Sequence, residues 1–150
     1  GVFFMNFIIR AKVLFIFIIA ISPNAFSEEI ITKCGSSYGH DFWIENKVFK
    51  KGGWEKSSLP DGKILLSKKN DKFILKFKDQ SGKLKSVQQL GGKIIPLENN
   101  KGNITLLVSY SGNVEIYSFT LNSQGKGELV WTKVRFSIFR NAGVASSKCG

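Results

Sequence analysis

Hydrophobic and polar residues alternate in short runs along the chain, and turn residues separate these runs. Phe73, Leu75 and Phe77 fall on one face of an extended segment, and Lys76 and Lys78 fall on the other. Asn70-Asp71 precedes this run and predicts a compact hairpin with "KILLSKK". No long stretch keeps a helical period free of glycine and turn signals. The pattern therefore predicts an all-β chain.

The clearest strands are "ITLLVSY", "NVEIYSFTL" and "ELVWTKVRFSIF", and they are apolar on both faces. Such strands are either covered on both sides or bind a partner. The first interpretation is a covered centre, and the second is a partner-binding apolar face formed by Tyr117, Phe119 and Trp131. Consecutive hairpins predict a single antiparallel meander of about eight strands. It would form a small up-and-down barrel or, alternatively, a two-sheet β-sandwich.

Residues 1–27 have the features of a secretory signal peptide. Arg10 and Lys12 precede an uninterrupted apolar run, and Ala25-Phe26-Ser27 offers the small residues that signal peptidase recognises. The apolar run is short for a membrane span, which needs about 20 residues, although an uncleaved anchor is the alternative. Residues 28–150 would then form one domain in the bacterial periplasm or outside the cell.

Two cysteines, Cys34 and Cys149, occur in the chain. Two cysteines near the ends of an exported domain predict a disulfide, which would stabilise the fold by about 4 to 5 kcal/mol in the chain-entropy model. Lys33 precedes Cys34 and the apolar run ends well before it, which argues against a lipid anchor. Because His40 is the single histidine, we expect no metal site and no cofactor.

The net charge of +11 comes from 22 basic and 11 acidic residues. Eight lysines in the first half of the domain could gather on one sheet face and attract an anionic envelope lipid or glycan. The alternative is a solvated face that protects a sheet edge. No nucleic-acid-binding motif is present, which argues against nucleic acid as a partner. The lysines are Lys50, Lys51, Lys68, Lys69, Lys76, Lys78, Lys83 and Lys85.

No catalytic motif stands out, and we expect no enzymatic activity. His40-Asp41 pairs a histidine with an acid, but no nucleophile motif accompanies it. A glycosidase needs two carboxylates across a cleft, and Glu115 with Glu128 is a pair that sequence alone leaves open.

The order of several short motifs resembles that of a group of small exported proteins of alphaproteobacteria. This resemblance covers nearly all of the chain after the leader. It implies export, one domain and a bridge between the two cysteines, but no activity. The matching segments are Cys34-Gly35-Ser36-Ser37-Tyr38, Trp54, Asp61-Gly62, "GGKII", Val108-Ser109-Tyr110, Glu115-Ile116-Tyr117-Ser118-Phe119, Leu129-Val130-Trp131 and Cys149.

The chain is also loosely similar to periplasmic inhibitors of C-type lysozyme, which are small exported β-barrels with a disulfide between their ends. It lacks their Ser-Gly-Ala-x-Tyr signature, which "YSGNVEIY" matches only in part. A basic protein would also be repelled by a basic lysozyme. We therefore expect an exported domain that binds a small ligand or an anionic envelope component. A protein-binding inhibitor or envelope assembly factor is the alternative, and an envelope hydrolase comes third.

Overall fold

The computed structural model describes residues 27–45, 51–78, 81–137 and 140–150. Strands dominate these ranges, and their one helical element is a 3₁₀ turn, η1, at Gln88–Leu90. The all-β prediction is thus confirmed. The strands are β1 (Glu29–Trp43), β2 (Gly53–Leu59), β3 (Ile64–Lys69), β4 (Lys72–Lys78), β5 (Leu84–Ser86), β6 (Lys93–Asn100), β7 (Asn103–Tyr110), β8 (Asn113–Leu121), β9 (Gly127–Arg135) and β10 (Asn141–Cys149).

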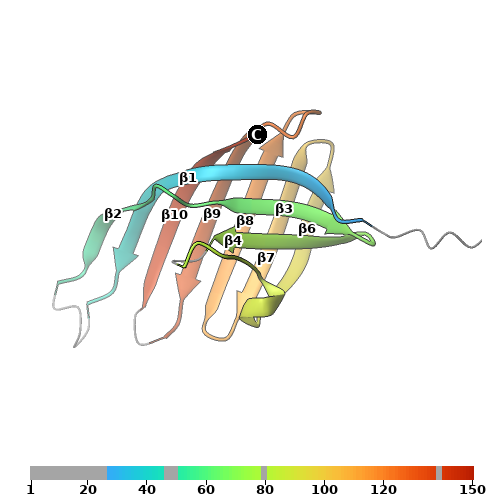
Figure 1. The fold of residues 1–150 in the computed structure, drawn as a ribbon. Coiled ribbons are helices and arrows are strands. Elements are labelled where there is room, and N and C mark those ends of the chain that lie inside the picture. Colours follow the sequence, from blue (N-terminus) through green and yellow to red (C-terminus); the bar gives the residue numbers. More distant parts are fainter. Residues whose placement is uncertain (1–26, 46–50, 79–80, 138–139) are drawn as a thin grey trace, which may run out of the picture.

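Nine strands follow one path of antiparallel pairs, in the order β5-β4-β3-β1-β10-β9-β8-β7-β6, and β2 pairs with β1 beside this path. The sheet curls so that β3 and β4 pass in front of β7 and β8 (Figure 1), and β4 comes close to β6. The result is a half-barrel. The predicted antiparallel meander is confirmed, although it contains ten strands where the sequence predicts about eight.

Strand β1 is long and serves two partners along one of its edges. Its first part, from Glu29 to Cys34, pairs with β3, and its second part, from Ser37 to Trp43, pairs with β2. Its other edge pairs with β10 on both sides of an irregularity between Cys34 and Ser37. As a result, β2 extends away from β3 and β4. These two strands therefore do not cover the end of the curled sheet where β2 lies (Figure 1).

The hydrophobic core lies where β3 and β4 cover the inner face of β7, β8 and β9. Alternation places Leu66 and Leu75 against Leu106, Phe119 and Leu129, all of which are almost completely buried. The predicted hairpin at Asn70-Asp71 is confirmed, since both residues adopt positive φ angles of 50° and 61°. We call the face of the curled sheet that bears this core the concave face.

The predicted disulfide is present between Cys34 and Cys149, which lie directly opposite each other on β1 and β10. Both cysteines are buried, with 2% and 9% of their surface exposed. The bridge therefore joins the first strand to the tenth at the edge of the core. Residues 1–26 of the predicted signal peptide lie outside the described residues. Within the described ranges, no helix is long and apolar enough to cross a membrane.

Candidate functional site

Beyond the core, the concave face becomes polar. Strand register places Asp41 on β1 opposite Gly143 on β10, Gly143 opposite Lys133 on β9, and Lys133 opposite Glu115 on β8. Residues paired in register point to the same face of a sheet, so these positions form one row across four strands. Asp41 lies in the part of β1 that pairs with β2 and not with β3, so the row lies toward the end of the concave face that β3 does not reach.

Asp41 and Lys133 form an ion pair across this row. The Lys133 Nζ donates to Asp41 Oδ2 over 3.0 Å, and the side chains keep only 17% and 12% of their surface exposed. Gly143 lies between them, and a Cβ at this position would collide with Asp41 Oδ1 and approach Lys133 Cε to 2.9 Å. The absence of a side chain at Gly143 is therefore what lets the two charges meet.

Glu115 accepts hydrogen bonds from two neighbours on its own strand. The Asn113 Nδ2 donates to Glu115 Oε1 over 2.7 Å, and the Tyr117 hydroxyl donates to Glu115 Oε2. The Tyr117 ring lies between the rings of Phe77 and Trp131, with centroid distances of 5.6 and 5.8 Å. These contacts hold Glu115 in one orientation beside an aromatic wall.

These side chains line a cleft of about 260 Å³, which we call the polar cleft. Strand β2 closes one side of it with Ser57, Ser58 and Leu59. Arg135 is exposed and has no ion-pair partner among the residues that the structure describes. The cleft thus contains one available cation beside two carboxylates that already accept hydrogen bonds. Its charged and aromatic lining consists of Asp41, Glu115, Tyr117, Trp131, Lys133 and Arg135.

Three buried amide atoms next to the cleft have no hydrogen-bond partner. They are Nδ2 and Oδ1 of Asn141, whose surface is only 2% exposed, and Oδ1 of Asn113. Both asparagines lie opposite Arg135 in register, one on each side of β9. A buried polar group without a partner costs about 1 to 3 kcal/mol, so such groups are rare in native proteins and call for an explanation.

The structure separates the residues that sequence suggested for catalysis. Neighbouring residues on a strand point to opposite faces, so Asp41 lies in the polar cleft while His40 lies on the convex face. Glu115 and Glu128 also lie on opposite faces of the sheet. Glu128 forms an exposed ion pair with Lys148. Within the described ranges, no group of three or more histidine, cysteine, aspartate or glutamate residues is arranged to hold a metal ion.

The suggested apolar partner face lies inside the protein. Tyr117 and Phe119 are 3% and 1% exposed and belong to the core, and Trp131 packs against that core and lines the polar cleft. Their place in the core follows from strand alternation, which directs the other set of side chains outward. The apolar side chains that these strands expose are Ile116, Val130 and Val134.

The predicted lysine surface is divided by the fold. Lys68, Lys69, Lys76, Lys78 and Lys85 lie on β3, β4 and β5, and Lys83 immediately precedes β5. Lys51 lies two residues before β2, and Lys50 lies outside the described residues. Six of the eight predicted lysines therefore belong to one flank of the half-barrel, which we call the lysine flank, and Lys72 on β4 lies there too.

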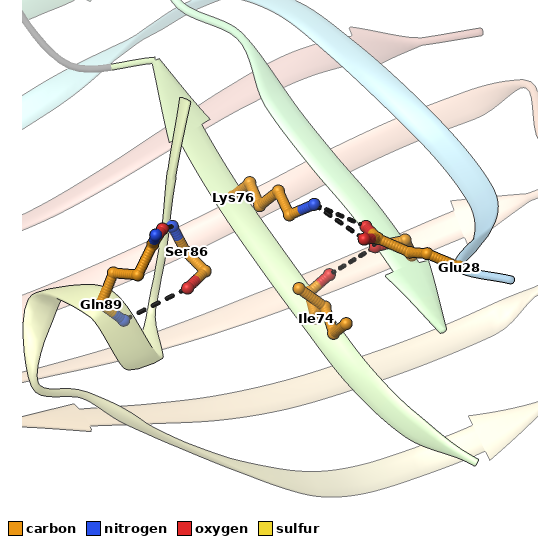
Figure 2. A network of polar contacts seen from close by, with 6 residues as sticks. Glu28, Ile74, Lys76, Ser86 and Gln89 are labelled. Atoms are coloured by element: carbon orange, nitrogen blue, oxygen red, sulfur yellow. Dashed lines mark hydrogen bonds and ion pairs between the residues drawn. The ribbon is translucent and has the colours of Figure 1, made fainter. Parts of the chain in front are cut away.

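Two lysines of this flank already have acidic partners. Lys68 pairs with Asp71 over 3.1 Å, and Lys76 pairs with Glu28 over 2.7 Å. Figure 2 shows Lys76 reaching the Glu28 carboxylate from β4. Hydrogen bonds from Lys76 and then from Ser67 lower the pKa of Glu28 below its ordinary value.

Comparisons of the chain with protein families, with curated proteins and with solved structures found no match. The function is therefore inferred from the chain's own residues.

Raising the pH above about 10 is expected to destabilise the fold through Tyr117. Burial, and then the Glu115 carboxylate, raise the pKa of Tyr117 well above its ordinary value. The unfolded chain therefore releases this proton at a lower pH than the folded chain does. Above about pH 10 the folded state binds more protons, so the free energy of unfolding falls with pH.

The measurement is urea unfolding of the wild type and of Tyr117→Phe from about pH 8 to about pH 11. The variant should lose less stability over this range, because it lacks the buried phenol of Tyr117. Tyr38→Phe, on the exposed side of β1, controls for the loss of one tyrosine. An equal fall with pH in the wild type and in Tyr117→Phe would contradict the role given to Tyr117.

Proposed function

We propose that this protein is an exported, non-enzymatic binding protein that holds a small polar ligand in the polar cleft. The observation behind this proposal is the gathering of Asp41, Glu115, Lys133 and Arg135 around one cleft on the concave face. Compact binding sites are concave and contain a few polar groups that fix the orientation of the ligand.

The cost of these polar groups to the fold supports a binding role. A buried ion pair such as Asp41–Lys133 is often no more stabilising than well-packed apolar residues would be. The amide atoms of Asn141 and Asn113 add a further cost as long as they have no partner. A ligand in the cleft that hydrogen-bonds to its charged side chains would offset part of this cost.

The volume and charge of the cleft restrict the ligand class. Pockets for drug-sized molecules measure about 300 to 1,000 Å³, so a cleft of about 260 Å³ suits a smaller molecule. Charges of both signs disfavour an acyl chain, and Trp131 offers one flat apolar surface. The ligand is then a small molecule with an anionic group that Arg135 binds and a ring or short chain that lies on Trp131.

Export of the protein is part of the same proposal. A buried disulfide between the first and last of the described strands suits an oxidising compartment. The secretory features of residues 1–27 and the resemblance to exported alphaproteobacterial proteins agree with it.

A protein-binding role as an inhibitor or envelope assembly factor is the second candidate, and the convex face favours it. Tyr38 and Trp54 are 62% and 66% exposed there, and Trp54 packs edge-on against Phe42 with a centroid distance of 5.3 Å. A groove of about 560 Å³ next to them is lined by Tyr38, Val130 and Val144. Exposed aromatic residues of this kind are enriched where proteins meet.

Native mass spectrometry of protein exported to a Gram-negative periplasm tests the proposal. The wild type should retain a small adduct that is lost on denaturation. Arg135→Gln should weaken its binding about 10- to 100-fold, because one charge-assisted hydrogen bond contributes about 1.5 to 3 kcal/mol. Arg140→Gln removes the same charge outside the cleft and should leave the adduct in place. A bare monomer with no affinity for small polar anions would overturn the proposal and direct the search to the convex face.

A further inference from the structure

Another hollow lies on the lysine flank, and it shares no residue with the polar cleft. Its volume is about 520 Å³, and we call it the lysine hollow. We infer that it binds a phosphate-bearing ligand between Lys69 and Lys72. The polar residues around it are Lys69, Asn70, Lys72, Lys76, Ser86, Gln88 and Gln89.

Lys69 and Lys72 lie directly opposite each other at the end of the β3–β4 hairpin. Both are exposed, and neither has an ion-pair partner among the described residues. Like charges directly opposite each other destabilise a strand pair. The intervening Asn70-Asp71 turn keeps the two lysines adjacent, because its tight geometry fixes the register. Holding these two cations together therefore lowers the stability of the fold.

The contrast with neighbouring lysines shows that this pair is not simply part of a balanced charged surface. Lys68 and Lys76 each have an acidic partner, Asp71 and Glu28 respectively. Glu28 also lies near enough to Lys69 to be influenced by its charge. Both carboxylate oxygens of Glu28 nevertheless accept hydrogen bonds from Lys76 Nζ, over 2.7 and 2.9 Å (Figure 2). The positive charge of Lys69 and Lys72 is thus left for an external anion.

The opposite wall of the hollow is fixed by a reciprocal pair of hydrogen bonds. The Ser86 backbone N–H donates to Gln89 Oε1 over 2.8 Å, and the Gln89 backbone N–H donates to Ser86 Oγ over 3.2 Å (Figure 2). This reciprocal pair resembles a capping box, although Ser86 lies one residue before Val87, the N-cap of η1. It links the end of β5 to η1. Gln88 is exposed next to it and lines the hollow, so its amide can donate to an anion.

These groups match the chemistry of phosphate. Lysine binds phosphate as a compact point charge, and two lysines balance a doubly charged group. The amide of Gln88 adds a neutral donor on the other side of the hollow. The phosphate can belong to a lipid head group or to a soluble molecule, since the recognised chemistry is the same in both.

Binding of two probes to the full exported protein tests this inference. The probes are pyrophosphate, measured by calorimetry, and vesicles of phosphatidylglycerol in phosphatidylcholine, measured by co-sedimentation. The wild type should bind at least one of them, and Lys69→Gln/Lys72→Gln should bind it roughly 10- to 30-fold more weakly. Binding of pyrophosphate would indicate a soluble ligand, and binding of the vesicles alone would indicate a lipid.

Two matched variants make the result specific. Lys51→Gln/Lys56→Gln removes the same charge from β2 and the segment just before it, and this variant should bind as the wild type does. Arg135→Gln alters the polar cleft and should also leave the phosphate probes unaffected, so this inference and the proposed function can fail separately. The hairpin variant should unfold at the same or a higher urea concentration, because it loses a repulsion. Failure of both probes to bind, or equal losses in the two lysine variants, would overturn the inference.

Discussion

Replacing both Cys34 and Cys149 with serine is expected to lower the free energy of unfolding by about 2 to 5 kcal/mol, which is the largest effect that we predict for any substitution. The bridge spans 115 residues, and closing a loop of this length strongly restricts the unfolded chain. It also fixes the pairing of β1 with β10, which joins the two parts of the sheet. The variant therefore loses a restraint at the position where the half-barrel is held together.

Urea unfolding of the oxidised wild type, the reduced wild type and the double serine variant measures this effect. The reduced wild type and the variant should unfold at similar, lower urea concentrations, which would separate the loss of the bridge from the change in side chain. Unchanged stability in both would mean that the β1–β10 hydrogen bonds hold the sheet without the bridge.

Removing either charge of the Asp41–Lys133 pair should cost about 2 to 4 kcal/mol, which is the second-largest expected effect. Both side chains are mostly buried, so Asp41→Asn leaves a lysine, and Lys133→Met leaves an aspartate, without its partner. Removing both charges together should restore much of the lost stability, because no buried charge is then left unpaired. The expected coupling between the two positions is therefore large.

A double-mutant cycle on urea unfolding measures this coupling. The matched control is the exposed pair of Glu128 and Lys148, whose side chains are 59% and 83% exposed. The corresponding cycle there should give a coupling of about 0 to 1 kcal/mol. Equal couplings in the two pairs would show that Asp41 and Lys133 are hydrated in solution and that the cleft is more open than the structure indicates.

Sequence patterning could predict most of the strands but not the last one. Strand β10 reads Asn-Ala-Gly-Val-Ala-Ser-Ser-Lys-Cys and has almost none of the β-branched and aromatic residues that mark strands. It is extended because β1 and β9 hydrogen-bond to its two edges, so tertiary pairing overrides its weak intrinsic preference. Small residues are needed here, since a Cβ at Gly39 on β1 would collide with Ala145.

Only part of the candidate site could be predicted from the sequence. Alternation along "ELVWTKVRF" puts Trp131, Lys133 and Arg135 on the same face as Leu129. The change from apolar to charged residues along this face indicates that the core ends there and a cleft begins. The contact of Lys133 with Asp41 joins positions 92 residues apart, and it depends on the register of two strand pairs that no local pattern reveals. The clustering of Lys68 to Lys85 was visible because those residues belong to consecutive hairpins.

The central place of β10 also determines how the chain can assemble. Without β10, the chain would form two separate antiparallel sheets, one of β1 to β5 and one of β6 to β9. Each sheet would have a hydrogen-bonding edge exposed. The strand that closes both edges is the last of the described strands to be synthesised. Assembly of the sheet is therefore a late event that depends on a distant contact, which favours slow folding. Until that moment the nascent protein resembles two aggregation-prone sheets rather than one domain, and a chaperone would have most to protect along these two open edges.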